Sequence, residues 1–398
     1  MDVYSEIFSY IESHRSRLCQ LVRKLVEERS ENPPGDTVEA AEAYASQLSK
    51  LRFKVETVRA EGRKVNLVAE WNCGRKETIL FNGHLDTVPV GKADGWIVDP
   101  FSGSVRGDWL YGRGSADDKG GLGCLTIAFE ALRSLGVQPK YNIAVHGVCD
   151  EEVGGRLGTL HLIQKGHVKA NYGVVVEGSV SRNRVFVRNA MKGIMKVQLT
   201  TFGKAAHAGN PKIGVNANLK MAKLLTALER VRFTYKPSRY LTPPTIAVGT
   251  ILQGGDKSNV IPKQCTSTSD IRYLPGMGRI SVQRDIMKVI RKIRRGDRDL
   301  KASVKVLVSD HKPAQLREDE PIVRLAAEAI RRVVGYSPRI MGGYGATDAS
   351  HLIHQARLPT LVGLGPGDLE LGQLHGVNER VSIKALVDLA KIYVSLVC

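Results

Sequence analysis

Apolar positions along the chain form short runs that alternate with longer helical stretches. The run TILFNG (78–83) is apolar on both faces, which is typical of a strand that helices cover on both sides of a sheet. The stretch PIVRLAAEAIRRVV (321–334) has the apolar spacing of a helix. This alternation predicts an α/β domain, a mixed sheet flanked by helices, formed by residues 1–184 and 307–398.

The middle of the chain follows a different pattern. GIMKVQLTTFG (193–203) alternates between apolar and polar residues, as a half-exposed strand does. A helical stretch, two strands, a second helical stretch and a last strand follow it, which gives the order βαββαβ. We therefore expect residues 185–306 to form a ferredoxin-like domain inserted into the α/β domain.

Composition narrows the class of protein. A length of 398 residues exceeds one ordinary core and agrees with two domains. The chain is 42% hydrophobic and 25% charged and has no run of 18 apolar residues, so no membrane association is expected and the cytoplasm is the expected compartment. The six cysteines form no CxxC pair, which indicates reduced thiols.

The net charge of +18 is concentrated in the middle domain. Residues 185–306 hold 24 lysines and arginines against 6 acids, whereas the flanking segments are balanced. Such an excess can attract an acidic substrate, an acidic carrier protein or nucleic acid, or it can be a solvated surface. Nucleic acid is the least favoured partner, because no aromatic residues alternate with the basic ones.

Candidate chemistry begins where the strand over residues 78–83 ends. FNGHLDTVP places His84 and Asp86 two positions apart, on one side of an extended chain. A carboxylate there can accept the second ring N–H of the histidine, which leaves the other ring nitrogen free to bind a metal ion. A histidine satisfied in a polar turn is the structural alternative.

Further acidic residues stand at the ends of other segments. Asp117 and Asp118 lie in the glycine-rich loop GRGSADDKGG, which fits no phosphate-binding fingerprint; they can bind a cation or cap the following helix. CDEEVGG brings Glu151 and Glu152 directly after an apolar run, and YGVVVEGS brings Glu177 to the end of another. Solvated turns are the alternative for both.

Together, five segments supply His, Asp, Glu, Glu and His, the last being His375 in QLHGVNE. Ligands of open α/β sheets bind at the carboxyl ends of the strands. Mixed imidazole and carboxylate ligands suit zinc or cobalt better than magnesium or calcium. The sequence therefore predicts a metal site, and a bridging carboxylate would allow it to hold two ions.

The motifs NGHLDTVP, GRGSADDKGG, DEEVGG, VVEGS and LHGVNE, in this order, resemble those of the dizinc aminoacylase and carboxypeptidase family. That family includes acetylornithine deacetylase, succinyl-diaminopimelate desuccinylase, glutamate carboxypeptidase and carnosinase-type dipeptidases. The resemblance covers nearly the whole chain and implies two zinc ions per subunit, which cobalt can replace. The implied ligands are His84 and Glu177 for one ion, Glu152 and His375 for the other, and Asp117 as the bridge, with a cis peptide between Asp117 and Asp118.

The resemblance also implies catalytic roles. Glu151 would be the general base that takes a proton from water and passes it to the leaving amine. Asp86 would orient His84. The inserted domain would be a lid and dimerisation domain, and its His207 would stabilise the oxyanion of a substrate across the dimer interface.

Substrate contacts follow from the same resemblance. Asn259 and Arg272 match positions that bind a substrate carboxylate, for which a guanidinium fork is well suited. Gly345 and Thr347, in GGYGATDAS, match a loop that surrounds the substrate's α-carboxylate. A structural role at a strand end is the alternative for Arg272.

We expect an enzyme that cleaves the amide bond of an N-acyl amino acid, of the acetylornithine deacetylase or succinyl-diaminopimelate desuccinylase type used in arginine and lysine biosynthesis. A metal-dependent dipeptidase or carboxypeptidase is the second expectation, and a non-catalytic binding protein on the same fold is the third. Two departures leave the subfamily open: Asp118 stands where the family usually has methionine, and VEGS lacks the usual proline.

Overall fold

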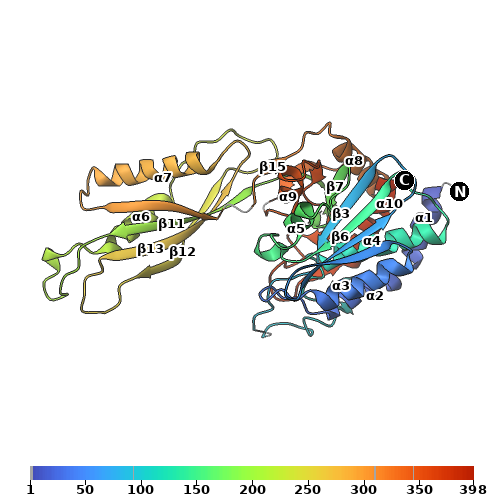
Figure 1. Cartoon of the computed structure of the whole chain (residues 1–398), viewed down its shortest axis with the longest axis horizontal. Helices are drawn as coiled ribbons and strands as arrows, with labels where there is room; N and C mark the ends of the chain where they lie inside the picture. The colour runs from blue at the N-terminus through green and yellow to red at the C-terminus, as the bar shows by residue number, and fades with distance from the viewer. Residues whose placement is uncertain (1–2, 93, 309–310, 344) are drawn as a thin grey trace. The chain divides into compact units, whose positions relative to one another are not determined.

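Two units make up the fold. The structure is a computed structural model that describes residues 3–92, 94–308, 311–343 and 345–398 (Figure 1). Unit 1 comprises Met1–Ala190 and Gln315–Cys398, and unit 2 comprises Met191–Ala314.

Unit 1 alternates helices and strands along the chain. Its helices are α1 (Val3–Ser13), α2 (Arg15–Glu27), α3 (Val38–Lys50), α4 (Lys119–Ser134), the short 3-10 helix η1 (Glu151–Val153), α5 (Thr159–Gln164), α8 (Pro321–Val334), α9 (Ala349–His354) and α10 (Ile383–Val397). Its strands, two of which extend into unit 2, are β1 (Lys54–Glu61), β2 (Lys64–Trp71), β3 (Thr78–His84), β4 (Ser104–Arg106), β5 (Trp109–Tyr111), β6 (Asn142–Val148), β7 (Tyr172–Val175), β8 (Gly178–Ser181), β9 (Arg184–Val185), β10 (Val187–Met191), β15 (Ala314–Gln315), β16 (Ile340–Gly343), β17 (Thr360–Leu361), β18 (Gly365–Asp368) and β19 (Arg380–Ser382).

The central sheet of unit 1 is mixed, as expected. Its six strands have the order β1-β2-β6-β3-β7-β17. Strands β6, β3, β7 and β17 run parallel, whereas β1 and β2 pair antiparallel with each other and β2 pairs antiparallel with β6. Parallel strands bring their carboxyl ends to one edge, so the segments that follow β3, β6 and β7 meet there.

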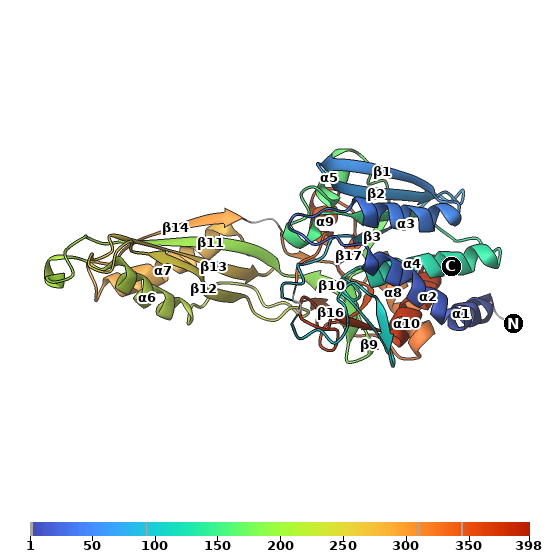
Figure 2. The ribbon, with the colours of Figure 1, turned by 90° about the horizontal axis from the view of Figure 1, so that it is seen from below.

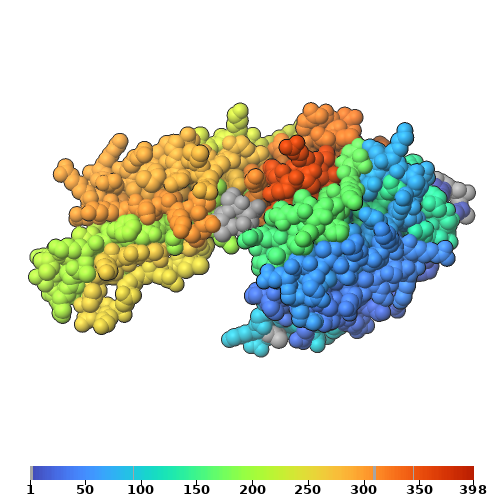
Figure 3. Space-filling view, viewed as in Figure 1, coloured from blue at the N-terminus to red at the C-terminus, as the bar shows by residue number. Residues whose placement is uncertain are grey.

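Helices cover both faces of this sheet, which explains why its strands are apolar on both sides. Ile79 and Phe81 of β3 belong to a large core shared with α1, α2, α3, α4, α8 and α10. Burial of each such side chain stabilises the fold by about 1.5–3 kcal/mol. The other face carries a smaller cluster that includes Val148 and Leu162, the latter on α5, and α5 contacts α9 (Figure 2). In the space-filling view the red surface of α9 adjoins the green surface of α5 (Figure 3).

Helix α4 approaches the sheet closely because its first turn is rich in glycine. A Cβ atom at Gly121 would lie 2.4 Å from the carbonyl oxygen of Val176, and one at Gly120 would lie 2.2 Å from the carbonyl oxygen of Ser115. Larger residues would therefore push the helix away from the strands. The close packing brings Asp117 and Asp118, which precede α4, to the edge of the sheet where β3 and β7 end.

Unit 2 has the expected βαββαβ order. It contains β11 (Gly193–Phe202), the 3-10 turn η2 (Pro211–Ile213), α6 (Ala217–Leu228), β12 (Thr245–Gly254), β13 (Gln264–Tyr273), α7 (Arg279–Arg294) and β14 (Lys301–Val308). Its antiparallel sheet has the order β12-β13-β11-β14. Met195, Val197 and Leu199 alternate with more exposed residues along β11 and are buried, as a one-sided sheet requires.

Two further expectations concern the whole described chain. Within residues 3–92, 94–308, 311–343 and 345–398, no helix combines the length and the apolar character needed to cross a bilayer. All six cysteines are free thiols, as expected.

Candidate metal centre

Three parallel strands deliver the candidate ligands to one edge of the central sheet. His84 is the last residue of β3, Glu151 and Glu152 follow β6 in η1, and Glu177 follows β7. His84 and Glu177 are buried at relative exposures of 1% and 9%. Asp117 comes from the loop before α4, so the sheet edge collects acidic side chains as the sequence indicated.

His84 uses both ring nitrogens. Its Nδ1–H donates to the backbone carbonyl of Asp86 at 2.8 Å, and its Nε2 lies 3.0 Å from Oδ1 of Asp117. The first contact fixes the ring so that Nε2 points toward the acidic residues. The hydrogen bond expected from the Asp86 carboxylate is made by the backbone carbonyl of the same residue, and Oδ1 of Asp86 lies 3.7 Å from Nδ1.

The Asp86 carboxylate has other partners. It accepts the backbone N–H of Glu151 at 3.2 Å, the backbone N–H of Glu152 at 3.3 Å and the side-chain amide of Asn32 at 2.9 Å. A fully buried carboxylate needs such donors, and these three come from two other segments of the chain. Asp86 therefore positions the turn that carries Glu151 and Glu152.

Asp117 lies between the two histidines. Its Oδ1 faces Nε2 of His84, and its Oδ2 lies 3.2 Å from Nε2 of His375. The same His375 nitrogen is 3.3 Å from Oε2 of Glu152, whose Oε1 accepts the backbone N–H of Val88. The Asp117–Asp118 peptide is cis, as the family resemblance implied.

Two overlapping groups of donor atoms result. Atoms of His84, Asp117 and Glu152 lie within 4.8 Å of one another, and so do atoms of His84, Glu151 and Glu177. His375 joins the first group through its contacts with Asp117 and Glu152. The structure thus brings together all five predicted ligands and the predicted base.

The electrostatics of this cluster favour bound cations. Burial and neighbouring carboxylates raise the pKa of Glu151 and of Glu177 well above the usual range. Hydrogen bonds to Asp117 and Glu152 raise the pKa of His375 to about 10. Four carboxylates in a buried site repel one another unless positive charge is supplied, and imidazole and carboxylate together suit zinc or cobalt. The donor set therefore fits two such ions.

The three site residues predicted in unit 2 do not form one cluster. His207 and Asn259 are exposed and lie in neighbouring segments, where the backbone N–H of Ala208 donates to the carbonyl of Asn259 at 2.9 Å. Arg272 lies near the opposite end of β13, and its guanidinium pairs with Asp270 at 2.7 Å. Two groups near opposite ends of a strand as long as β13 (Gln264–Tyr273) are separated by about 25–30 Å.

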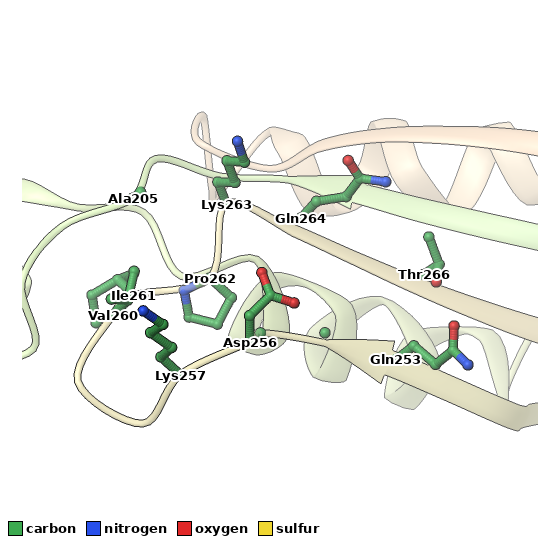
Figure 4. Close-up of a pocket in the computed structure, with 12 residues that line it drawn as sticks. Ala205, Gln253, Asp256, Lys257, Val260, Ile261, Pro262, Lys263, Gln264 and Thr266 are labelled. Atoms are coloured by element: carbon green, nitrogen blue, oxygen red, sulfur yellow. The ribbon is translucent and has the colours of Figure 1, made fainter.

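A pocket of about 720 Å³ opens beside the segment that carries Asn259 (Figure 4). Lys257 and Val260, which flank Asn259 closely, line it together with Lys263 and Gln264 at the start of β13. The pocket combines basic, acidic, amide and apolar side chains.

Gly345 and Thr347 differ in exposure. Gly345 is exposed and has open space around it. Thr347 is buried at 1% relative exposure, and its hydroxyl donates to the carbonyl of Val362 at 2.9 Å. This hydroxyl anchors the loop to the neighbouring chain, so the loop backbone and Gly345 are the parts available to a ligand.

Sequence reasoning missed Arg188, a buried cation beside this chemistry. Its guanidinium donates to the carbonyl of Gly178, next to Glu177, at 2.6 Å. A Cβ atom at Gly343 or Gly363 would lie 2.1 or 2.7 Å from the guanidinium, so these glycines form the slot that holds it. Burial lowers the pKa of Arg188, and the charge of Glu177 opposes this effect. A single cation inside the apolar strand VFVRNAM was the available signal.

Comparison with known proteins places this geometry in a family. The sequence profile of Peptidase family M20/M25/M40 matches residues 80–398. The chain is 25% identical to N-formyl-4-amino-5-aminomethyl-2-methylpyrimidine deformylase of Bacillus subtilis (97% of this chain, 95% of that protein). It is 29% identical to succinyl-diaminopimelate desuccinylase 2 of a Ruegeria species (89% and 88%).

A solved structure supports the fold independently. The M20 family metallo-carboxypeptidase of Sulfolobus solfataricus superposes with a TM-score of 0.78 at 19% identity, covering 96% of this chain and 98% of that one. The chain belongs to Peptidase family M20/M25/M40, a family of metal-dependent peptidases and amidohydrolases.

Proposed function

We propose that the protein is a dinuclear zinc amidohydrolase that removes the acyl group of an N-acyl amino acid. The observation that carries this proposal is the position of Glu151, a carboxylate placed beside His84 and Glu177 but on the same turn as Glu152. Hydrolysis needs a base beside the metal ligands. A structural metal site has no need of such a base.

The proposed ligands are shared between two sites. His84 and Glu177 would hold one zinc ion, Glu152 and His375 the other, with Asp117 contributing to both through its two oxygens; cobalt would replace zinc. When bound, the ions supply Lewis-acid activation of water and of the scissile carbonyl. Unit 1 would thus be the catalytic domain.

Glu151 would move the proton. Its carboxylate accepts a proton from the attacking water and returns it to the nitrogen of the leaving amine, so that the amide C–N bond breaks without releasing an amide anion. Such general acid–base catalysis contributes about 10²–10⁴-fold to the rate. Asp86 supports this step by holding the backbone of Glu151 and Glu152.

The relatives and the basic charge support a substrate class. The two relatives are named for removing a formyl and a succinyl group, which supports an N-acyl substrate of the acetylornithine deacetylase or succinyl-diaminopimelate desuccinylase type, in arginine or lysine biosynthesis in the cytoplasm. Arg272, Asn259 and Gly345 would contact the substrate, with Thr347 fixing the loop of Gly345. An acidic substrate or an acidic carrier-protein adduct would be attracted by the basic unit 2.

A homodimer through unit 2, acting as a lid, completes the proposal. His207 and Asn259 lie far from Arg272 in this unit, so they would serve the partner's active site rather than the same one. The edge strand β12 presents Ile251 and Leu252, each 57% exposed, as a surface for the second copy.

A metal-dependent dipeptidase or carboxypeptidase is the second candidate, and the metallo-carboxypeptidase neighbour favours it. Zinc- or cobalt-loaded protein should therefore be screened against N-acetyl amino acids, N-succinyl amino acids and dipeptides. We expect turnover of an N-acyl amino acid that Glu151→Gln abolishes with zinc retained, whereas Glu152→Ala loses zinc. Equal zinc content and equal activity in both variants would contradict the assignment. Turnover of dipeptides alone would favour the peptidase.

A further inference from the structure

A buried ion pair joins two distant segments of unit 1 at the metal centre. Nη1 of Arg113 donates to Oε2 of Glu379 at 2.5 Å, and the two residues are 266 positions apart in the chain. Both side chains are interior, with relative exposures of 2% and 1%. Removing two charges from water is unfavourable, so such a pair stabilises a fold little by itself unless further hydrogen bonds satisfy both groups.

Those further hydrogen bonds go to the segments that carry two candidate ligands. Oε1 of Glu379 accepts the backbone N–H of Ala116 at 3.0 Å and that of Asp117 at 3.2 Å. Nη2 of Arg113 donates to the carbonyl of His375 at 3.3 Å and to that of Gly376 at 3.2 Å. One ion pair therefore holds the backbones of both Asp117 and His375.

The His375 segment has particular need of this support. The side chain of His375 is 54% exposed, and its backbone has φ of 62°, which a non-glycine residue adopts at an energetic penalty. Its Nε2 nevertheless lies 3.2 Å from Asp117 and 3.3 Å from Glu152. Surface packing alone would leave this side chain free to turn away.

We propose that Arg113 and Glu379 are positioning residues that set the distance between Asp117 and His375. They thereby determine the zinc affinity of the site formed by Glu152 and His375. The inference rests on the proposed function, because it takes Asp117 and His375 as ligands. His84 is the last residue of β3 and Glu177 follows β7 closely, so the central sheet fixes the backbone of this pair. Loss of the ion pair should therefore weaken the binding of the ion at Glu152 and His375 much more than that of the ion at His84 and Glu177.

The test measures zinc affinity rather than turnover. Metal-free protein is titrated with zinc in competition with a chromophoric chelator, for the wild type, Glu379→Gln and Arg113→Lys. Loss of a partner that orients ligands weakens metal binding by about 10–100-fold. We expect that loss for the ion held by Glu152 and His375, and a clearly smaller loss for the ion held by His84 and Glu177, which shares only Asp117. Arg113→Lys keeps the positive charge but loses the planar guanidinium that donates to Glu379 and to the His375 segment at once. It should therefore show the same unequal loss of affinity at the two sites.

A matched control is available on the surface of the same unit. Arg182 and Glu370 form an ion pair at 2.6 Å with side-chain exposures of 79% and 45%. Glu370→Gln makes the same chemical change outside the metal centre and should leave both affinities unchanged. Circular dichroism and Tm of the metal-free variants test whether each variant is folded. If Glu379→Gln does not fold, the zinc affinities of Arg113→Lys alone test the positioning role.

The outcomes separate this inference from the proposed function. Unchanged affinity at both sites in Arg113→Lys and Glu379→Gln, or an equal loss at both, would overturn the positioning role, and the latter would show a general structural role. Wild-type protein that binds fewer than two zinc ions would contradict the proposed dinuclear site itself, whatever the variants do.

Discussion

The carboxylate of Asp86 accepts a hydrogen bond from the backbone N–H of Glu151 at 3.2 Å, although the two residues follow different strands. A second bond, from the N–H of Glu152, fixes the same turn. The residue that was expected to orient a histidine through its carboxylate thus aligns the proposed base and a proposed ligand.

Asp86→Asn should lower kcat/KM about 10–100-fold, because a side-chain amide has one acceptor oxygen for two backbone donors. Zinc content should stay at the wild-type value, since the contact with His84 is made by the backbone carbonyl. Metal analysis and kinetics on the same preparation check both parts. A variant whose zinc content falls while its turnover per fully loaded site is unchanged would show that the carboxylate acts on His84 instead.

Lys64→Met should destabilise unit 1 and reduce turnover. Lys64 of β2 pairs with Asp150 at 2.5 Å, and Asp150 also accepts the N–H of Leu157 at 3.1 Å. Asp150 is 4% exposed and precedes Glu151 with φ of 70°, so the pair fixes the start of the catalytic turn. Leaving a buried carboxylate without its cation costs about 1–3 kcal/mol.

Urea unfolding of the metal-free protein measures the loss. Lys384→Met is the control, because Lys384 pairs with Asp388 in an i,i+4 contact and is 69% exposed. Its effect should stay within about 0.5 kcal/mol. Equal losses of unfolding free energy in Lys64→Met and Lys384→Met would contradict the role given to Lys64.

Asp118→Met should stabilise the protein. Asp118 is fully buried, and neither carboxylate oxygen has a side-chain hydrogen-bond partner among the residues that the structure describes. A buried polar group without a partner costs about 1–3 kcal/mol, and methionine adapts to irregular apolar space. A higher Tm with unchanged zinc content is expected. A lower Tm would mean that the carboxylate has a partner in the working protein.

His146→Leu should reduce the sensitivity of folding to acid. Burial lowers the pKa of His146 on β6 to about 3, and neither ring nitrogen has a hydrogen-bond partner among the described residues. Because the folded protein binds this proton less readily than the unfolded chain, whose histidine has a pKa near 6.5, stability is lost as pH falls below about 6.5.

At pH 5 the loss attributable to His146 is about 2 kcal/mol, from 1.4 kcal/mol for each pH unit below the unfolded pKa. Urea unfolding at pH 7 and pH 5 should show a smaller difference in His146→Leu than in the wild type. The exposed His354 provides the control substitution, His354→Leu. An unchanged pH dependence in His146→Leu would show that the ring is solvated.

Much of the fold and the metal cluster could be predicted because both depend on local sequence. Runs such as TILFNG can be recognised as covered strands, and parallel strands must bring their carboxyl ends together, so His84, Glu152 and Glu177 could be expected to converge. The family motifs supplied the remaining ligands, Asp117 and His375.

The supporting contacts could not be predicted, because they join residues that are remote in sequence and depend on backbone atoms. Nothing in the run VFVRNAM indicates that Gly343 and Gly363 form a slot for Arg188. The sequence also does not indicate that Thr347 is buried with its hydroxyl donating to the carbonyl of Val362. Asp86 does contact His84, but through its backbone carbonyl and not through its carboxylate. A spacing of two residues does not tell which of the two groups makes the hydrogen bond.

The central claim is that two zinc ions and Glu151 form one hydrolytic site. It is tested most directly by titrating the metal-free protein with zinc while following release of the free amine from an N-acetyl or N-succinyl amino acid. We predict that activity rises until two ions are bound per chain and that Glu151→Gln binds the same two ions without turnover. Full occupancy with no amide cleavage in the wild type, or undiminished cleavage in Glu151→Gln, would contradict the account.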